Sequence, residues 1–524
     1  MSDQSCDVVI VGAGPVGLGM GRMLGLAGHT VVILEQWREP YRLPRAVHFD
    51  DEIGRIFQSM GLTREIQAIS EPVPDFYEWH NTDGDALVRI DWSGTGPSGW
   101  PTANFFNQPE LEKVLADAIE SMPTVTLLRG AEVVGLEELD DEVVVTHTTA
   151  VQKQRRTRAR FVVGCDGANS FVRERIGTTM QDHGFFFDWL IVDTVPREQR
   201  DWSPMNWQLC DPARPTTIVS GGPGRRRWEF MRLPGETREE LNTTTKAWAL
   251  LEPWGRTPAN SELERHAVYT FAARWADQWH RGRLLIAGDA AHQMPPFAGQ
   301  GMCSGLRDVA NLGWKLDRVL RGQSDIALLD TYTTERSQHV QYAITMSIEL
   351  GRVICVLDDE QAAERDARMI ADEADPARVL PVTALPVLGP GVLDDGDHPL
   401  RGTLAPQFPV RHHGEQVLLD EATGDGPVLL VSRDRRAADF DAAVTATMDE
   451  LGGQVVSIAE RGDPDLGDPT GAWTQWFAGQ GVTAVLLRPD HYIFGVSSDD
   501  TATGRLVATY LGRVGARVTP TAAR

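Results

Sequence analysis

Cysteine is scarce in this chain of 524 residues. The five cysteines stand far apart, and no two have C-x-x-C spacing: Cys6, Cys165, Cys210, Cys303 and Cys355. A zinc ribbon or a thioredoxin-type dithiol formed by neighbouring cysteines is therefore excluded. Few, scattered cysteines fit a reducing compartment, so we expect a cytoplasmic location.

Basic residues are in the minority, and long apolar runs are missing. Lys and Arg number 50 against 74 Asp and Glu, so the formal net charge is −24. A nucleic-acid binder or a protein that binds anionic membranes is expected to carry the opposite charge. No run approaches the ~18 consecutive apolar residues of a membrane span, and no basic segment precedes an apolar core at the N-terminus. We expect neither a nucleic-acid partner nor a membrane.

The first fifty residues have the order of a βαβ unit. Residues 8–11 are a short apolar run typical of a buried parallel strand. Gly12, Gly14 and Gly17 follow in G-x-G-x-x-G spacing, and Glu35 closes the next strand. Such glycines allow a tight turn and the close approach of a pyrophosphate, which the helix N-terminus attracts. The unit predicts dinucleotide binding, without distinguishing FAD from NAD.

A second glycine-rich loop lies about 250 residues further along the chain. We expect a buried strand over 283–287, with Asp289 at its end, and an amphipathic helix over 304–320 after the turn at 299–301. NAD needs no second remote site, whereas the ribityl chain and ring system of FAD extend well beyond the pyrophosphate. Asp289 can bond ribityl hydroxyls, and the helix N-terminus can stabilise an anionic reduced flavin. The second loop therefore favours FAD.

A third element, Asp166-Gly167, either serves the nucleotide or begins an N-capped helix at Ser170. With this element between the two loops, the chain resembles the class A flavoprotein monooxygenases, the para-hydroxybenzoate hydroxylase family, over roughly residues 5–350. The 3-(3-hydroxyphenyl)propionate hydroxylase group is the most similar. That likeness rests on Pro44-Arg45-Ala46, Asp50-Asp51-Glu52, Gln108, residues 226–230 and residues 288–301.

The resemblance implies an α/β fold. Its parts are a discontinuous Rossmann-type FAD-binding domain at 1–179 and 276–355, an inserted β-sheet substrate domain at 180–275, a connector at 356–399 and a thioredoxin-like domain at 400–524. No cysteine follows Cys355, so the last domain has no thiol chemistry. We expect it to be structural or to support assembly, and the protein to be a monomer or a homodimer.

The resemblance also assigns the cofactor site, and no metal is expected in it. Pro295 would lie beside the oxygen-reacting face of the flavin, and NAD(P)H would visit the Asp-Gly segment transiently. The residues expected to bind the cofactor are Gly12, Gly14, Pro15, Gly17, Glu35, Arg45, Gln108, Val134, Asp166, Gly288, Asp289, Pro296, Gly299, Gly301 and Met302.

The activity expected from this likeness is hydroxylation of a small phenolic substrate with NAD(P)H and O2, through a flavin C4a-hydroperoxide. A base that takes the phenol proton assists, and an ordinary pKa near neutrality makes His48 the candidate. The alternative is a structural histidine bonded to Asp50 or Asp51. His292 either takes part in the site or braces its loop.

For two further groups of residues, the sequence leaves open whether they belong to the functional site or have a structural role. One of Arg226 and Arg227 either faces an anionic ligand or is solvated. Aromatic side chains could wall the substrate pocket or pack in the core, and the candidates are Trp92, Trp100, Trp207 and Trp228.

The main alternative function is a tailoring oxygenase that hydroxylates, epoxidises or carries out a Baeyer–Villiger oxidation on a polyketide-type aromatic product. It would differ only in pocket size. A flavin-dependent halogenase is disfavoured because its W-x-W-x-I motif is absent, and a disulfide reductase because paired cysteines are absent after the first βαβ unit. A flavoprotein that binds a ligand without turnover is the third class.

Overall fold

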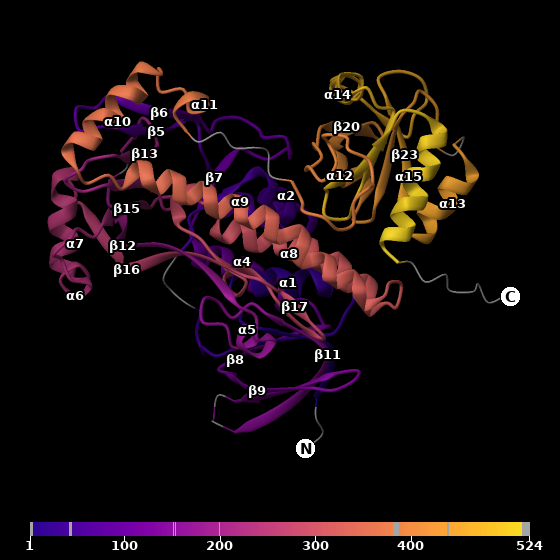
Figure 1. The fold of residues 1–524 in the computed structure, drawn as a ribbon, viewed down its shortest axis with the longest axis horizontal. Helices are drawn as coiled ribbons and strands as arrows, with labels where there is room; N and C mark the ends of the chain where they lie inside the picture. The colour runs from indigo at the N-terminus through magenta and orange to yellow at the C-terminus, as the bar shows by residue number, and fades with distance from the viewer. Residues whose placement is uncertain are drawn as a thin grey trace.

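The computed structural model describes residues 4–515 except 41–44, 150, 152, 199, 381–386 and 438–439. Figure 1 shows three parts: the sheet beneath the N-terminal helices, a second sheet to its left, and a C-terminal domain drawn in orange to yellow. The long helices α8 (Gly301–Leu320) and α9 (Asp330–Ile354) run through the middle of the molecule.

The first sheet has eight strands and carries the first glycine loop. Its central strands run parallel, and residues 8–11 and 31–34 are almost fully buried, as continuous apolar runs require. Because β18 pairs with β11, segments far apart in the sequence share this sheet. Its strands are β17 (His280–Arg281), β18 (Leu284–Ile286), β11 (Gln154–Gly164), β1 (Gln4–Val11), β2 (Val31–Glu35) and β8 (Val125–Arg129), with β10 (Val143–Thr148) and β9 (Val133–Glu138) beyond β11.

Two helices cross closely above this sheet. A Cβ on Gly305 of α8 would lie only 2.5 Å from Val16 Cγ2 of α1 (Pro15–Leu26), and one on Gly313 only 2.2 Å from Met23 Sδ. The small residues therefore permit the crossing. It brings the N-termini of both helices, and with them both glycine loops, to one region.

The second sheet also has eight strands. The long strands β12 and β16 pair over most of their length, and β5 joins β13 in parallel, so the sheet extends beyond residues 180–275. In order its strands are β19 (His292–Gln293), β16 (Ser261–Ala276), β12 (Met180–Pro196), β15 (Arg226–Met231), β14 (Thr216–Ser220), β13 (Asn206–Leu209), β5 (Phe76–His80) and β6 (Ala86–Asp91).

The two faces of the second sheet have different neighbours. The outer face packs on α6 (Arg238–Leu241), α7 (Thr244–Leu251) and the short turn at Glu252–Trp254. The inner face packs on the segment before α8 and on α9. Two helices of the connector, α10 (Asp359–Ala371) and α11 (Pro376–Val379), contact β6.

A small sheet joins the two large ones. It consists of β3 (His48–Asp50), β7 (Ala103–Phe106) and β4 (Ser70–Pro72). The helices α2 (Asp51–Ser59) and α4 (Gln108–Glu120) follow β3 and β7, α3 (Thr63–Ile69) leads directly into β4, and α5 (Phe171–Ile176) follows β11. Asp50 caps α2 by accepting the backbone N–H of Ile53. The sheet thereby places His48 between the glycine loops and the inner face of the second sheet.

The C-terminal domain has the strand order and directions of the thioredoxin fold. The strand β22 is parallel to β23 and antiparallel to β25, which is antiparallel to β26. Its strands are β20 (Pro409–His412), β21 (Glu415–Leu418), β22 (Val428–Ser432), β23 (Gln454–Ala459), β24 (Leu466–Gly467), β25 (Ala484–Leu487) and β26 (Ile493–Ser497). Its helices are α12 (Leu419–Thr423), α13 (Ala442–Glu450), α14 (Ala472–Gln480) and α15 (Asp500–Arg513).

The helix expected over 304–320 begins three residues earlier, at Gly301, and its polar stripe is buried instead of facing solvent. Asn311 donates to Asp490, and Arg318 donates to the carbonyl of Leu451, so the C-terminal domain covers the stripe. Among the described residues, no single helix is long and apolar enough to cross a membrane. One pair, Ile326–Ile354 with Asp359–Ala371, passes that test only when joined across a 111° bend.

Candidate active site

The first glycine loop has the geometry that its spacing predicts. Gly12 has φ +101°, and a Cβ there would lie 2.4 Å from the carbonyl oxygen of Cys165. A Cβ on Gly17 would lie 2.0 Å from the carbonyl oxygen of Gly12. In contrast, no atom lies within 4 Å of a Cβ on Gly14, and α1 begins at the next residue, Pro15. The loop is therefore packed on one side and open where a pyrophosphate would approach.

Glu35 holds this loop at the end of β2. Its carboxylate accepts the backbone N–H groups of Ala13 and Trp37, both at 2.8 Å. The carbonyl of Glu35 accepts the N–H of Ala131, and β9, with Val134 on its exposed side, begins two residues later. Glu35 and Val134 thus flank the same end of the sheet, and the carboxylate keeps lone pairs for further hydrogen bonds.

Gln108 connects the first loop region to Arg45. Its Oε1 accepts the backbone N–H groups of Arg45 and Ala46 at 2.9 and 2.8 Å. Its Nε2 donates to Glu112, whose pKa burial raises to about 6. Arg45 Nη1 lies 3.6 Å from Asp289 Oδ2, with both side chains about half exposed. Arg45 therefore joins residues that the sequence places far apart; Pro44, beside it, lies outside the described residues.

The second loop is braced by a residue that the sequence pattern did not single out. Asp308 accepts the backbone N–H of Gly288 at 2.9 Å, His292 Nε2 at 2.7 Å and Arg336 Nε at 2.9 Å. The neighbouring arginine and histidine hold the pKa of the buried Asp308 below its ordinary value, against its burial. His292 therefore braces the loop, as one of the two interpretations had it. A charged Arg-Asp pair at 307–308, early in the amphipathic helix, was the available signal.

Asp166 is engaged within its own turn. It accepts the hydroxyl of Ser170 at 2.5 Å and the backbone N–H of Val172 at 3.1 Å. Ser170 caps α5, and Arg173 of that helix donates to the carbonyl of Ala290, in the second loop. Burial raises the pKa of Asp166. The segment thus begins a capped helix and also contacts the second glycine loop.

Residues 294–301 lead from the second loop into α8. Pro295 is buried, Pro296–Ala298 forms one 3-10 turn, and Gly299 has φ +65°. The helix then begins at Gly301, and no side chain caps it. The first N–H groups of the helix, including that of Met302, are left for another partner and carry a partial positive charge.

His48 faces this segment. A Cβ on Gly299 would lie 2.8 Å from His48 Nδ1, and the imidazole stacks on Trp92 with ring centres 5.1 Å apart. Neither ring nitrogen makes a hydrogen bond of normal geometry to a residue that the structure describes, although the backbone of Gly299 lies close enough to act on the pKa of the ring. Asp50 is bonded to Arg307 and Gln300 instead. Burial lowers the pKa of His48, which favours the neutral imidazole.

Aromatic side chains of one apolar cluster extend from Trp92 and Phe105, the two rings that contact His48. Tyr77 stacks on Trp92 at 4.5 Å, while Phe297 contacts Trp189 at 5.6 Å and Phe271 at 6.4 Å. The sequence did not single out Trp189, whose indole N–H is buried without a partner in the described chain. This wall is apolar with a few free polar atoms, as pockets for small aromatic molecules are.

Of the other tryptophan candidates, none contacts His48. Trp100 packs in the first core and donates to Gln58, and Trp207 and Trp228 lie on the outer face of the second sheet.

The two arginines of β15 point to opposite faces, and both are buried. Arg226 lies over the ring of Trp202 on the outer face, at 4.4 Å, where burial lowers its pKa to about 9. Arg227 lies on the inner face, pairs with Asp193 at 2.7 Å and donates to the carbonyl of Arg45. Arg227 therefore supports the segment that carries Arg45.

These residues fit FAD. The open side of Gly14, the half-exposed carboxylate of Asp289 and the uncapped start of α8 follow one another along a single region. Each matches the part of FAD that its chemistry would bind: the pyrophosphate, the ribityl hydroxyls and the electron-rich edge of the ring.

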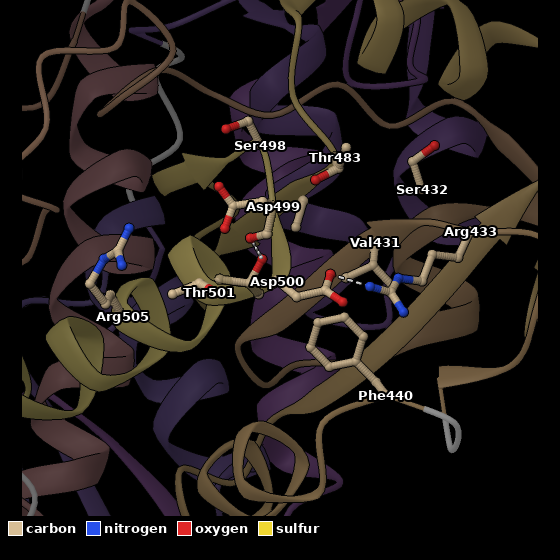
Figure 2. A pocket seen from close by; sticks show the side chains of 12 residues that line it. Val431, Ser432, Arg433, Phe440, Thr483, Ser498, Asp499, Asp500, Thr501 and Arg505 are labelled. Carbon is tan, nitrogen blue, oxygen red and sulfur yellow. Dashed lines mark hydrogen bonds and ion pairs between the residues drawn. The ribbon is translucent and has the colours of Figure 1, made fainter.

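A hollow of about 740 Å³ lies in the C-terminal domain. Figure 2 shows it between the end of β22 and the start of α15, where Arg433 pairs with Asp500. Its lining is polar and contains no cysteine. It therefore offers no thiol redox chemistry and lies apart from the region of the glycine loops.

Family models match most of the chain. Residues 5–347 match the model described as an FAD binding domain, and residues 402–511 match the one described as the HcaD C-terminal domain.

Two curated relatives are similar over nearly the whole chain. The probable NADH-specific resorcinol 4-hydroxylase of Rhodococcus jostii (strain RHA1) is 39% identical over 501 residues, which cover 95% of this chain and 93% of that protein. The 3-(3-hydroxy-phenyl)propionate/3-hydroxycinnamic acid hydroxylase of Escherichia coli (strain K12) is 32% identical over 525 residues, with the same coverage.

Solved structures share the fold. The flavin-dependent monooxygenase PieE, in complex with FAD and substrate, superposes with a TM-score of 0.81 at 22% identity, covering 98% of this chain and 100% of that one. Aklavinone-11 hydroxylase with FAD and aklavinone gives a TM-score of 0.78 at 23% identity, with the same coverage.

Proposed function

This chain belongs to the FAD-dependent aromatic hydroxylases, and on that premise we propose that it hydroxylates a small phenol, ortho or para to its hydroxyl, with NADH as the electron donor. The single observation that carries the substrate class is His48, a buried neutral imidazole with two unpaired nitrogens beside an aromatic wall. A phenolic hydroxyl is a group that such an imidazole can bind and deprotonate.

FAD is the cofactor of this family, and when bound it accepts hydride from the nicotinamide and activates O2. We assign its pyrophosphate to Gly12, Gly14, Pro15 and Gly17, its ribose to Glu35 with Val134 alongside, and its ribityl chain to Asp289 and Arg45. Gln108 and Gly288 hold the backbone of these loops. Pro295, Pro296, Gly299, Gly301 and Met302 form the surface against the ring, and Asp166 holds its own turn beside them.

The protein supplies positioning, proton transfer and exclusion of water. His48 takes the proton of the phenol, which raises the nucleophilicity of the ring carbons. Trp92, Trp189 and Phe297 enclose the ring and keep water away from the reacting atoms. The preference for a small phenol and for NADH is supported by the relative at 39% identity, whose name states resorcinol and NADH specificity.

The expected location is the cytoplasm, supported by five free cysteines. Whether the protein is a monomer or a homodimer stays a prediction.

The test is NADH oxidation under 18O2 against phenols of graded size, with resorcinol first and NADPH as the matched control donor. We expect accelerated NADH oxidation and one labelled oxygen atom in a ring-hydroxylated product. Hydrogen peroxide as the sole product across the panel would contradict the proposal. Turnover confined to large polycyclic phenols would assign the chain to the tailoring oxygenases, and label in a non-aromatic ketone would indicate Baeyer–Villiger oxidation.

A further inference from the structure

A chain of hydrogen bonds runs from the C-terminal domain to the turn before α8. Tyr492, which lies just before β26, donates its hydroxyl to Glu52 Oε1 of α2 at 2.7 Å. Glu52 Oε2 accepts Arg307 Nε of α8 at 2.5 Å. These three side chains come from three separate parts of the fold, and all are largely buried.

Arg307 distributes its remaining donors around the site. Its Nη2 donates to Asp50 at 2.6 Å, and its Nη1 donates to the side chain of Gln300 at 2.8 Å. Gln300 precedes the first residue of α8 and also donates to Asp50. Asp50 lies two residues after His48 on β3. Arg307 therefore fixes both the turn at 299–301 and the strand that carries His48.

We propose that Tyr492 is a positioning residue for the turn at 299–301, acting through Glu52 and Arg307. The tyrosine occupies one oxygen of Glu52, so the carboxylate holds Arg307 through a single nitrogen. Without that donor, the free oxygen of a buried carboxylate would seek a second nitrogen of the guanidinium, the bidentate geometry that this pair favours. Arg307 could then no longer serve both Gln300 and Asp50.

The electrostatics agree with this role. Burial raises the pKa of Tyr492 well above its ordinary value, so the phenol stays protonated and remains a donor. Asp50 and Glu52 keep Arg307 charged although it is buried. Thus the C-terminal domain, which has no cysteine after Cys355, contributes one side chain to the geometry of the site. The contact between this turn and the flavin rests on the proposed function, whereas the hydrogen bonds are observed in the structure itself.

The experiment compares Tyr492→Phe with Tyr510→Phe. Both remove a buried hydroxyl from the same domain, but Tyr510 lies on α15, outside the chain of bonds. The first readout is hydrogen–deuterium exchange of the peptide covering 294–303, with FAD bound and after FAD has been removed. We expect Tyr492→Phe to speed exchange by roughly 10-fold, the scale of one hydrogen bond to a charged group, and Tyr510→Phe to leave it unchanged.

The second readout is product formed per NADH consumed, which we expect to fall about threefold in Tyr492→Phe while Tyr510→Phe keeps the wild-type ratio. Glu52→Gln weakens the next bond, between Glu52 and Arg307, and replaces Tyr492→Phe if that variant does not fold. The double variant that combines Tyr492→Phe with Glu52→Gln should exchange no faster than Glu52→Gln alone. Unchanged exchange in Tyr492→Phe, equal effects of the two tyrosine variants, or additive effects would overturn the proposal. Exchange is measured without substrate, so it decides the question even if no phenol is hydroxylated.

Discussion

Buried polar groups are hydrogen-bonded to one another at the domain interface, whereas those of His48 lack a partner among the described residues. At the interface, Glu335 accepts Lys315 and Arg488 at 2.8 and 2.7 Å, and Arg488 also pairs with Asp490 at 2.6 Å. Beside the second sheet, both nitrogens of His48 lack a partner in the described chain. Burying a polar group is costly unless it is hydrogen-bonded. The paired network therefore joins domains, whereas we infer that a bound ligand supplies the partner of the unpaired imidazole.

Whether an unpaired buried nitrogen indicates a bound ligand depends on the residue type. Unpaired indole nitrogens also occur at Trp228 and Trp473, inside two other hydrophobic clusters. An indole has a single donor on a large apolar body, so a core tolerates it. An imidazole is smaller and carries two nitrogens, so its apolar surface offsets little of the cost of leaving both unpaired. His292, whose Nε2 is bonded to Asp308, is the internal reference for a structural histidine.

The largest effect is expected from breaking the paired network. Glu335→Gln leaves Lys315 and Arg488 buried with Asp490 as their remaining carboxylate, and we expect it to lower the free energy of unfolding by ~3–5 kcal/mol. The measurement is urea denaturation at pH 7. Glu349→Gln, on the same helix with an exposed partner in Arg352, is the control and should stay within ~0.5 kcal/mol. Equal midpoints for the two variants would show that the network stabilises nothing.

Acidification is expected to lower the free energy of unfolding by a smaller amount, through a histidine at the same interface. Burial lowers the pKa of His491 from 6.5 to about 4, although Asp420 lies 3.5 Å away. Between pH 6.5 and 4 the unfolded chain therefore binds more protons than the folded one, so stability falls as the pH drops through this window. The loss is on the order of 3 kcal/mol.

His491→Asn should flatten that pH dependence, since asparagine tolerates the φ of +66° at this position and takes up no proton. The measurement is the urea midpoint at pH 4, 5, 6 and 7. His413→Asn, in the same domain at φ +50° but exposed, should keep the wild-type slope. A slope that survives in His491→Asn would assign the acid sensitivity to other groups.

Much of the architecture could be predicted from the sequence, because local patterns carry it. The apolar run at 8–11, the glycine spacing and Glu35 define a βαβ unit without knowledge of the rest of the chain. The extension of the second sheet to β5 and β6 could not be read in this way, since strand pairing between distant segments leaves no local signal.

The site was predicted unevenly for the same reason. Glycines and loop acids are recognisable by spacing, whereas Asp308, Arg307 and Trp189 acquire their roles only through contacts made across the fold. The helix over 301–320 illustrates the limit. Its polar stripe looks solvent-facing in the sequence, and only the docked C-terminal domain turns it into a buried network.

The most direct test of this account is the hydroxylation rate of His48→Leu, taken with its free energy of unfolding. Leucine removes two unpaired buried nitrogens at similar volume, so we expect unchanged or greater stability and a ~10²-fold slower hydroxylation, with a smaller effect on FAD reduction by NADH. Lower stability together with undiminished hydroxylation would contradict the account, because His48 would then be a structural residue.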